Sequence, residues 1–178
     1  MNLALIFAGG TGTRMNSKTK PKQFLELNGK PIIIHTIELF ESHPEIDAIA
    51  VVCLESWIGY LNELLERFRI KKVKYVVPGG ETGQQSIRNG LTAFWDDQDI
   101  PRDSLVLIHD GVRPLINEDI ITRSIECAKQ YGNAITVTPA IETIITVSED
   151  DSVDQIMDRS KCRMARAPQT FRLCDIVE

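Results

Sequence analysis

Short apolar runs alternate with amphipathic segments along most of the chain. The apolar runs have the length of buried strands and fall at residues 3–8, 48–54, 74–77, 104–109 and 134–138. Apolar positions with helical spacing lie between them, at residues 32–41, 57–68, 85–95 and 117–131. A chain that alternates strand and helix in this way typically builds a parallel sheet with helices on its faces. The pattern predicts an α/β fold with a mostly parallel, twisted sheet flanked by helices.

Residues that favour helix ends agree with this phasing. Pro31 suits the first turn of a helix. Asn117 is a good N-cap, and the acids Glu118 and Asp119 follow it near the positive end of the helix dipole. Gly132 is then expected to end that helix.

The pattern changes after Pro139. Residues 141–147 and 153–157 are expected to form a β-hairpin with the acidic tip 148–152, added to the sheet rather than threaded through it. A protruding hairpin exposes strand edges and apolar side chains unless something covers them. A partner subunit would provide that cover. Residues 139–167 are called the arm below.

Length and composition restrict the class of protein. With 178 residues, 43% of them hydrophobic and 25% charged, the sequence predicts one globular domain over residues 1–178. The net charge of −5 disfavours nonspecific binding to nucleic acid or to an anionic membrane, so a bound polyanion must meet a local cluster of cations. The apolar runs are too short to span a bilayer, and no basic segment followed by a long apolar stretch begins the sequence. We therefore expect a cytoplasmic protein with a small phosphorylated ligand and with no nucleic-acid or membrane partner.

The cysteines indicate neither a zinc site nor a disulfide framework. They lie far apart and form no Cys-x-x-Cys pair: Cys53, Cys127, Cys162 and Cys174. Cys53 falls inside an apolar strand and is expected to be a small core residue.

A glycine-rich loop follows the first predicted strand. It contains Gly9, Gly10 and Gly12. Glycines let a main chain approach a ligand closely, adopt positive φ freely and expose backbone N–H groups to an anion. Arg14 and Lys22 add full positive charges, although the loop matches neither the P-loop nor the Gly-x-Gly-x-x-Gly dinucleotide fingerprint. The loop indicates a polyphosphate site of another type, and a plain turn with solvated surface cations is the alternative.

A carboxylate ends the strongly apolar strand at 104–109. Asp110 lies at its carboxyl end, where a hard oxygen ligand can share Mg²⁺ with phosphate oxygens, and nearby Arg113 would suit a phosphate. The alternative is that Asp110 caps the following turn. We favour the metal-linked role, and we expect His109 to be packed or hydrogen-bonded rather than catalytic.

A second glycine-rich loop covers residues 79–86. Backbone groups and a hydroxyl that can hydrogen-bond to a nucleotide base are offered there by Gly79, Gly80 and Ser86. A flexible connection with Ser86 as an ordinary helix cap is the alternative.

Arginines recur on the far side of the predicted hairpin. They are Arg159, Arg163 and Arg166. Such a group forms either a solvated basic face or a second anion site opposite the first, and the sequence leaves both open.

Taken in order, these motifs resemble a known family. The matching segments are Ala8–Met15, Pro21–Phe24, Gly79–Gly80 with Ser86, His109–Pro114, Asp158–Ser160 and Pro168–Phe171. They are similar to the sugar-alcohol-phosphate cytidylyltransferases, and the likeness covers essentially the whole chain. The resemblance implies a Rossmann-like nucleotidyltransferase fold that binds CTP and Mg²⁺ and forms a CDP-linked polyol with release of pyrophosphate. It also implies a homodimer in which the arm reaches across to the other subunit.

The resemblance assigns a role to each matching position. Positions along CTP are Ala8, Gly9, Gly10, Gly12 and Gly111, and those that contact the cytosine are Gly79, Gly80 and Ser86. Arg14 and Lys22 would be the catalytic cations that grip the triphosphate, and Asp110 would be the metal-linked aspartate. The polyol phosphate would be held by a further set, partly on the arm: Arg113, Thr143 and Arg159.

Some positions separate this chain from other members of the family. The first motif reads Ala-Gly-Gly-Thr-Gly where enzymes for 2-C-methyl-D-erythritol 4-phosphate more often have Ala-Ala-Gly, which favours the branch that acts on D-ribitol 5-phosphate. Gly83 stands where the family usually has an arginine, and members usually continue beyond the position of Glu178 into a segment with another lysine. Three alternatives therefore stay open. The acceptor is 2-C-methyl-D-erythritol 4-phosphate, the chain is a fragment of a longer enzyme, or the protein is a CTP-binding module with reduced turnover.

Overall fold

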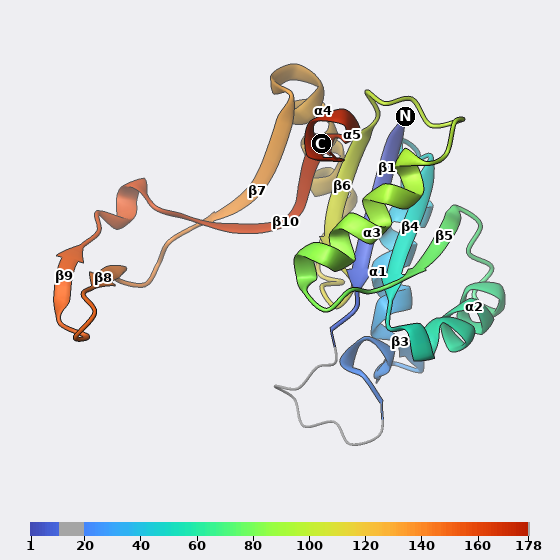
Figure 1. Cartoon of the computed structure of the whole chain (residues 1–178), viewed down its shortest axis with the longest axis horizontal. Coiled ribbons are helices and arrows are strands. Elements are labelled where there is room, and N and C mark those ends of the chain that lie inside the picture. Colours follow the sequence, from blue (N-terminus) through green and yellow to red (C-terminus); the bar gives the residue numbers. More distant parts are fainter. Residues whose placement is uncertain (11–19, 178) are drawn as a thin grey trace.

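A six-stranded sheet forms the centre of the molecule (Figure 1). The computed structural model describes residues 1–10 and 20–177. In spatial order the strands are β5 (Val73–Pro78), β4 (Ala48–Cys53), β1 (Asn2–Ala8), β6 (Leu105–Asp110), β10 (Arg163–Arg172) and β7 (Asn133–Pro139). β1 pairs in parallel with β4 and β6, and β4 with β5, whereas β10 runs antiparallel to β6 and β7. The mostly parallel sheet predicted from the sequence is confirmed.

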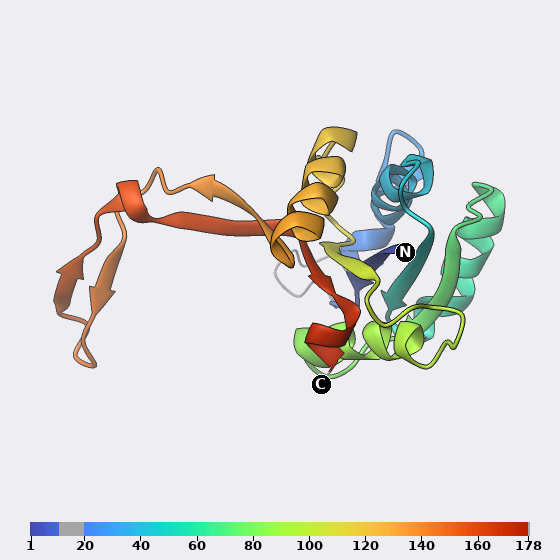
Figure 2. The same ribbon diagram turned by 90° about the horizontal axis from the view of Figure 1, so that it is seen from above.

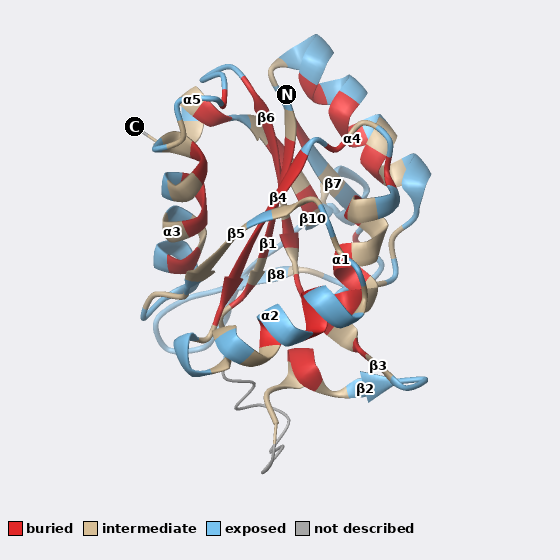
Figure 3. Ribbon diagram, turned by 90° about the vertical axis from the view of Figure 1, so that its right-hand side faces the viewer, coloured by how far each residue is buried: buried red, intermediate tan, exposed pale blue. Residues whose placement is uncertain are grey.

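Helices cover both faces of this sheet (Figure 3). One face carries α1 (Ile32–Ser42), α2 (Ile58–Arg67) and α4 (Glu118–Tyr131), and the other carries α3 (Gly83–Trp95) and α5 (Leu173–Val177). Along β1, Ala4 and Ile6 pack on the first face, and Leu3 and Leu5 on the second. Because both faces are buried, the central strands are apolar throughout, and this is why continuous apolar runs mark them in the sequence.

The ends of the helices follow most of the sequence signals. The Asn117 side chain accepts the Ile120 N–H at 3.0 Å, and Gly132 ends α4 with a φ of 91°. The prediction for Pro31 is wrong by one residue: its ψ of 141° is extended, so α1 begins at Ile32. The remaining short elements of the body are η2 (Lys22–Phe24), β2 (Glu26–Leu27), β3 (Lys30–Pro31) and η3 (Glu55–Trp57). In the described part of the chain, no helix has both the length and the apolar content needed to cross a bilayer.

The arm extends far from this body (Figures 1 and 2). Its tip is a separate two-stranded sheet of β8 (Ile145–Val147) and β9 (Val153–Ile156), followed by η4 (Arg159–Lys161). The hairpin is therefore confirmed, but the expectation that it is added to the central sheet is wrong. β10 instead enters that sheet between β6 and β7, and its pairing with β7 shifts register between Ala165 and Gln169. This strand was not predicted, because Pro168 and charged residues interrupt its apolar pattern.

Apolar side chains are exposed along the arm and its root. They are Ile135, Val137, Ile141, Ile145, Val147, Val153, Ile156, Met157 and Met164. Single exposed apolar residues are ordinary on a protein surface, whereas a contiguous group of them marks a contact surface.

Candidate active site

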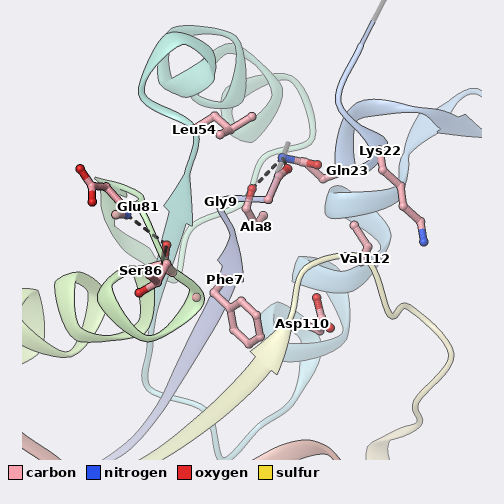
Figure 4. A pocket seen from close by; sticks show the side chains of 14 residues that line it. Phe7, Ala8, Gly9, Lys22, Gln23, Leu54, Glu81, Ser86, Asp110 and Val112 are labelled. Atoms are coloured by element: carbon pink, nitrogen blue, oxygen red, sulfur yellow. Dashed lines mark hydrogen bonds between the residues drawn. The ribbon is translucent and has the colours of Figure 1, made fainter. Parts of the chain in front are cut away.

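A cavity of about 530 Å³ opens at the carboxyl ends of the central strands (Figure 4). Parts of all three loops that the sequence singled out line it: Ala8, Gly9 and Gly10 from the first, Gly80 and Ser86 from the second, and Asp110 from the third. Lys22 from η2 and Leu54, the residue after β4, also line it. The strand order reverses beside β1, because β4 and β5 follow on one side of it and β6 lies on the other. Ligands of open α/β sheets bind at such a topological switch point.

Close packing explains one glycine in each of the two glycine-rich loops, Gly9 and Gly79. A Cβ on Gly9 would lie 3.1 Å from the Ser86 Oγ, and one on Gly79 would lie 3.2 Å from the same atom. Gly79 itself sits behind the lining and donates its N–H to the Cys53 carbonyl at 2.8 Å. Among the described glycines, those with positive φ are Gly29 and Gly132, outside these loops. The described glycines of the cavity therefore do not use the left-handed backbone that glycine allows, and Gly9 and Gly79 are required because the two loops touch there.

Ser86 braces the second loop. Its Oγ accepts the Gly80 N–H and donates to the Thr82 carbonyl, both at 3.0 Å. The interpretation of Ser86 as an ordinary cap is wrong, because Thr82 caps α3 and forms a capping box with Gln85. The Gly80 N–H is also occupied and is not offered to a ligand. Contact of this loop with a cytosine stays a prediction.

Gln23 supports the first loop, a role that was not predicted although the residue lies in the matching segment Pro21–Phe24. Its side chain is buried, and its Nε2 donates to the Ala8 carbonyl at 2.6 Å and to the Gly10 carbonyl at 3.3 Å. The next residue, Phe24, stacks on Trp57 with ring centroids 4.8 Å apart. These contacts fix η2 against the glycine loop. The sequence signal that could have identified this role is the position of the Gln23 amide, directly after the candidate phosphate-binding residue Lys22.

Lys22 occupies the edge of the cavity on the side of Val112 and Asp110, across from Glu81 and Ser86 (Figure 4). Its ammonium group points away from the centre of the cavity in this view. A long, partly exposed lysine changes rotamer within nanoseconds, so the side chain can turn toward a bound anion. Gly12 and Arg14 lie outside the described residues.

Asp110 forms an ion pair with Arg113. The Arg113 Nε donates to the Asp110 Oδ2 at 2.7 Å, and the arginine N–H donates to the Asp110 carbonyl at 3.1 Å. The alternative, in which Asp110 closes the following turn through its backbone, is therefore present in the structure, while the carboxylate of the same residue pairs with the guanidinium. Asp110 lines the large cavity, whereas Arg113 lines a smaller one beside it.

The other predicted site residues do not line the large cavity. Gly111 lies behind it and donates its N–H to the Phe7 carbonyl at 2.9 Å, and a Cβ there would lie 2.9 Å from the Ala8 Cβ. Thr143 and Arg159 are exposed on the arm, which Figure 2 shows well away from the body. Within one chain they are not brought together with Asp110.

His109 is packed, as expected. It is fully buried against Phe40, and its Nε2 donates to the Arg113 carbonyl at 3.0 Å. The Nδ1 atom has no hydrogen-bond partner among the described residues. Burial therefore lowers the pKa of His109 and keeps the ring neutral.

This burial predicts a loss of stability in mild acid. An unfolded histidine takes up a proton near pH 6.5, while the folded ring resists it, so the free energy of unfolding should fall as the pH drops through that value. We expect the melting temperature, measured with EDTA present, to fall from pH 7.5 to pH 5.5, and to fall less steeply in His109→Gln. Equal slopes for the two proteins would contradict the assignment.

The fold and the position of the cavity are typical of α/β proteins that bind nucleotides, and comparison with known proteins narrows this class. Residues 2–178 match the family described as 2-C-methyl-D-erythritol 4-phosphate cytidylyltransferase, IspD. The chain is 58% identical over 178 residues to ribitol-5-phosphate cytidylyltransferase of Vibrio parahaemolyticus, covering 100% of this chain and 74% of that protein. It is 39% identical over 179 residues to 2-C-methyl-D-erythritol 4-phosphate cytidylyltransferase of Clostridium acetobutylicum, covering 100% and 75%.

A solved structure agrees with the sequence comparison. The crystal structure of 4-diphosphocytidyl-2C-methyl-D-erythritol synthase from Anaerococcus prevotii superposes with a TM-score of 0.81 at 25% identity, covering 98% of this chain and 71% of that one. The chain therefore belongs to the cytidylyltransferase family. The resemblance found in the sequence motifs and the nucleotidyltransferase fold that it implied are both confirmed.

Proposed function

We propose that this protein transfers CMP from CTP to D-ribitol 5-phosphate, giving CDP-ribitol and pyrophosphate. The observation that carries the proposal is the single cavity in which two glycine loops, Lys22 and Asp110 meet at the carboxyl ends of the strands. Membership of a CTP-dependent family supports the nucleotide, and the 58% identical relative named for ribitol 5-phosphate supports the acceptor. The reaction would take place in the cytoplasm and would supply CDP-ribitol for teichoic acid synthesis.

The reaction requires the protein to orient the two substrates and to stabilise negative charge, and it depends less on proton transfer by a side chain. A phosphate oxygen of the acceptor attacks the α-phosphorus of CTP, and the bond from that phosphorus to the bridging oxygen breaks. Pyrophosphate leaves with the electron pair. Because a phosphate monoester is largely ionised near neutral pH, no side chain has to deprotonate the nucleophile. The protein must hold two polyanions together and stabilise charge on the leaving group, and we assign this to Lys22 and Arg14.

Asp110 fits a role as ligand of Mg²⁺. One of its oxygens accepts a hydrogen bond from Arg113, and the other would be the ligand of a metal that phosphate oxygens would share. No group of three or more acidic, histidine or cysteine side chains able to hold a metal occurs among residues 1–10 and 20–177. Bound Mg²⁺ would neutralise charge on the triphosphate.

An acceptor panel separates this function from its rivals. Pyrophosphate release is measured with CTP, Mg²⁺ and either D-ribitol 5-phosphate or 2-C-methyl-D-erythritol 4-phosphate. We expect a rate at least about tenfold higher with the ribitol ester, a difference of about 1.4 kcal/mol in transition-state binding. The reverse preference would establish the erythritol acceptor. CTP binding without release from either ester would establish a binding module.

We further infer that the protein is a homodimer joined through the arm. The exposed apolar residues of the arm support this, as does the distance of the arm from the body, since Thr143 and Arg159 can then reach the cavity of a second copy. We also treat residues 1–178 as one domain that carries this arm.

The proposed role of the arm leads to a prediction of a dimer in solution. We expect light scattering at micromolar concentration to give twice the chain mass of 20.0 kDa, and the double variant Val153→Asp, Ile156→Asp to give a single chain, because charges at an apolar interface are costly to bury. Leu115→Asp is the matched control: Leu115 is 94% exposed but lies outside the arm, so this variant should remain a dimer. A wild-type mass of one chain would overturn the dimer.

A further inference from the structure

A second, smaller cavity of about 210 Å³ lies at the root of the arm. Its lining comes from β1, α3, the end of β6 and the following turn, and β10: Phe7, Ile87, Ile108, Asp110, Arg113, Ala165, Arg166, Ala167 and Gln169. Phe7 and Asp110 also line the large cavity, so the two cavities adjoin at these residues. A ligand in the small cavity would therefore lie beside a nucleotide in the large one.

The charged groups of the small cavity favour an anion. Arg113 and Arg166 contribute two positive charges, and Asp110 contributes the one negative charge of the lining. Asp110 is already paired with Arg113 at 2.7 Å, which leaves the Arg166 charge without compensation in the lining. The Gln169 amide can add a further hydrogen bond, and the small side chains of Ala165 and Ala167 leave room. The whole chain carries a net charge of −5, so this is a local excess of cations.

The structure distinguishes Arg166 from the other arginines of its group. Arg159 donates to the Ile141 carbonyl, and Arg163 donates to the carbonyls of Ser160 and Cys162 on the arm. Arg166 lines the cavity instead, and its guanidinium makes no hydrogen bond or ion pair to the described part of the chain. A guanidinium of this kind can bind a phosphate through two parallel hydrogen bonds.

We propose that Arg166 binds the phosphate group of the acceptor in the small cavity, in the same chain that binds CTP beside Asp110. The proposal rests on the proposed function and deepens it, because it identifies a residue that recognises the acceptor as a phosphate monoester. A phosphate held there lies on the arm side of Asp110, and CTP occupies the other side. The two reactants then meet where the cavities adjoin, and Arg166 orients the attacking group.

The test separates acceptor binding from nucleotide binding. In Arg166→Gln, the KM for D-ribitol 5-phosphate should rise about tenfold or more, because a charge-assisted hydrogen bond to the phosphate is lost. The KM for CTP should stay within about twofold. Arg172→Gln is the matched control, because Arg172 is an exposed arginine of the same strand outside both cavities and should leave both constants unchanged. Calorimetric titration of each protein with D-ribitol 5-phosphate, in the presence of a non-hydrolysable CTP analogue, measures acceptor binding without turnover.

The outcomes distinguish this inference from the function on which it rests. Wild-type turnover with an unchanged acceptor KM in Arg166→Gln would overturn the role of Arg166 and leave the cytidylyltransferase intact. A wild-type protein that binds the ester but does not turn over, with binding lost in Arg166→Gln, would support the site and overturn the activity. Failure of the wild-type protein to bind the ester would overturn both. Equal loss of CTP and ester binding in Arg166→Gln would indicate general damage and would also overturn the specific role.

Discussion

Replacing Lys22 with alanine is expected to lower kcat for CDP-ribitol formation by about a hundredfold or more, the effect of removing one preorganised charge that stabilises the transition state. The residue is well placed for this. It lies at the edge of the large cavity, and its neighbours Gln23 and Phe24 fix the short helix η2 against the glycine loop and Trp57. The main chain of Lys22 is thereby held in place while its side chain remains able to turn toward phosphate.

The fold should tolerate this change. A partly exposed lysine contributes little to stability, so we expect the melting temperature of Lys22→Ala to stay within about 2 °C of wild type. Lys71→Ala is the control, because Lys71 is an exposed lysine just before β5, at the edge of the sheet opposite the cavity. If Lys22→Ala retained more than about half of the wild-type rate in steady-state pyrophosphate release, the assigned role would be wrong.

The sequence was a good guide to the body of the molecule because local and long-range requirements coincide there. Strands buried on both faces must be continuously apolar, and the helices between them must carry one apolar face, so each element leaves its own pattern. The carboxyl ends of parallel strands share one edge of the sheet, and for this reason the loops containing Gly9, Gly80 and Asp110 could be placed together before the fold was known.

The parts that escaped prediction depend on contacts that leave no local pattern. β10 pairs with β6 through Phe171 and Val106, residues far apart in the sequence, while Pro168 interrupts its own run. Gln23 acts through carbonyls of Ala8 and Gly10, and an amide that supports a loop looks the same in sequence as one in solvent. The small cavity forms only when the root of the arm lies beside the end of β6.

Asp110→Asn is expected to reduce kcat by about a hundredfold or more and to weaken divalent metal binding in the presence of CTP, because an amide is a poorer ligand of a hard cation than a carboxylate. The amide oxygen can still accept the Arg113 hydrogen bond, so the turn should keep its shape. The ion pair is partly exposed, and its loss should cost at most about 1 kcal/mol of folding free energy.

Two measurements distinguish a lost metal ligand from a damaged site. Titration with Mn²⁺ and CTP should show weaker metal binding in Asp110→Asn, whereas raising Mg²⁺ should recover part of its lost rate, since mass action refills a weakened site. Asp103→Asn is the matched control, because Asp103 is exposed at the amino end of the same strand and should change neither quantity. Unchanged Mn²⁺ affinity together with a large fall in kcat would show that Asp110 acts by orienting Arg113 and would remove the metal from the proposed site.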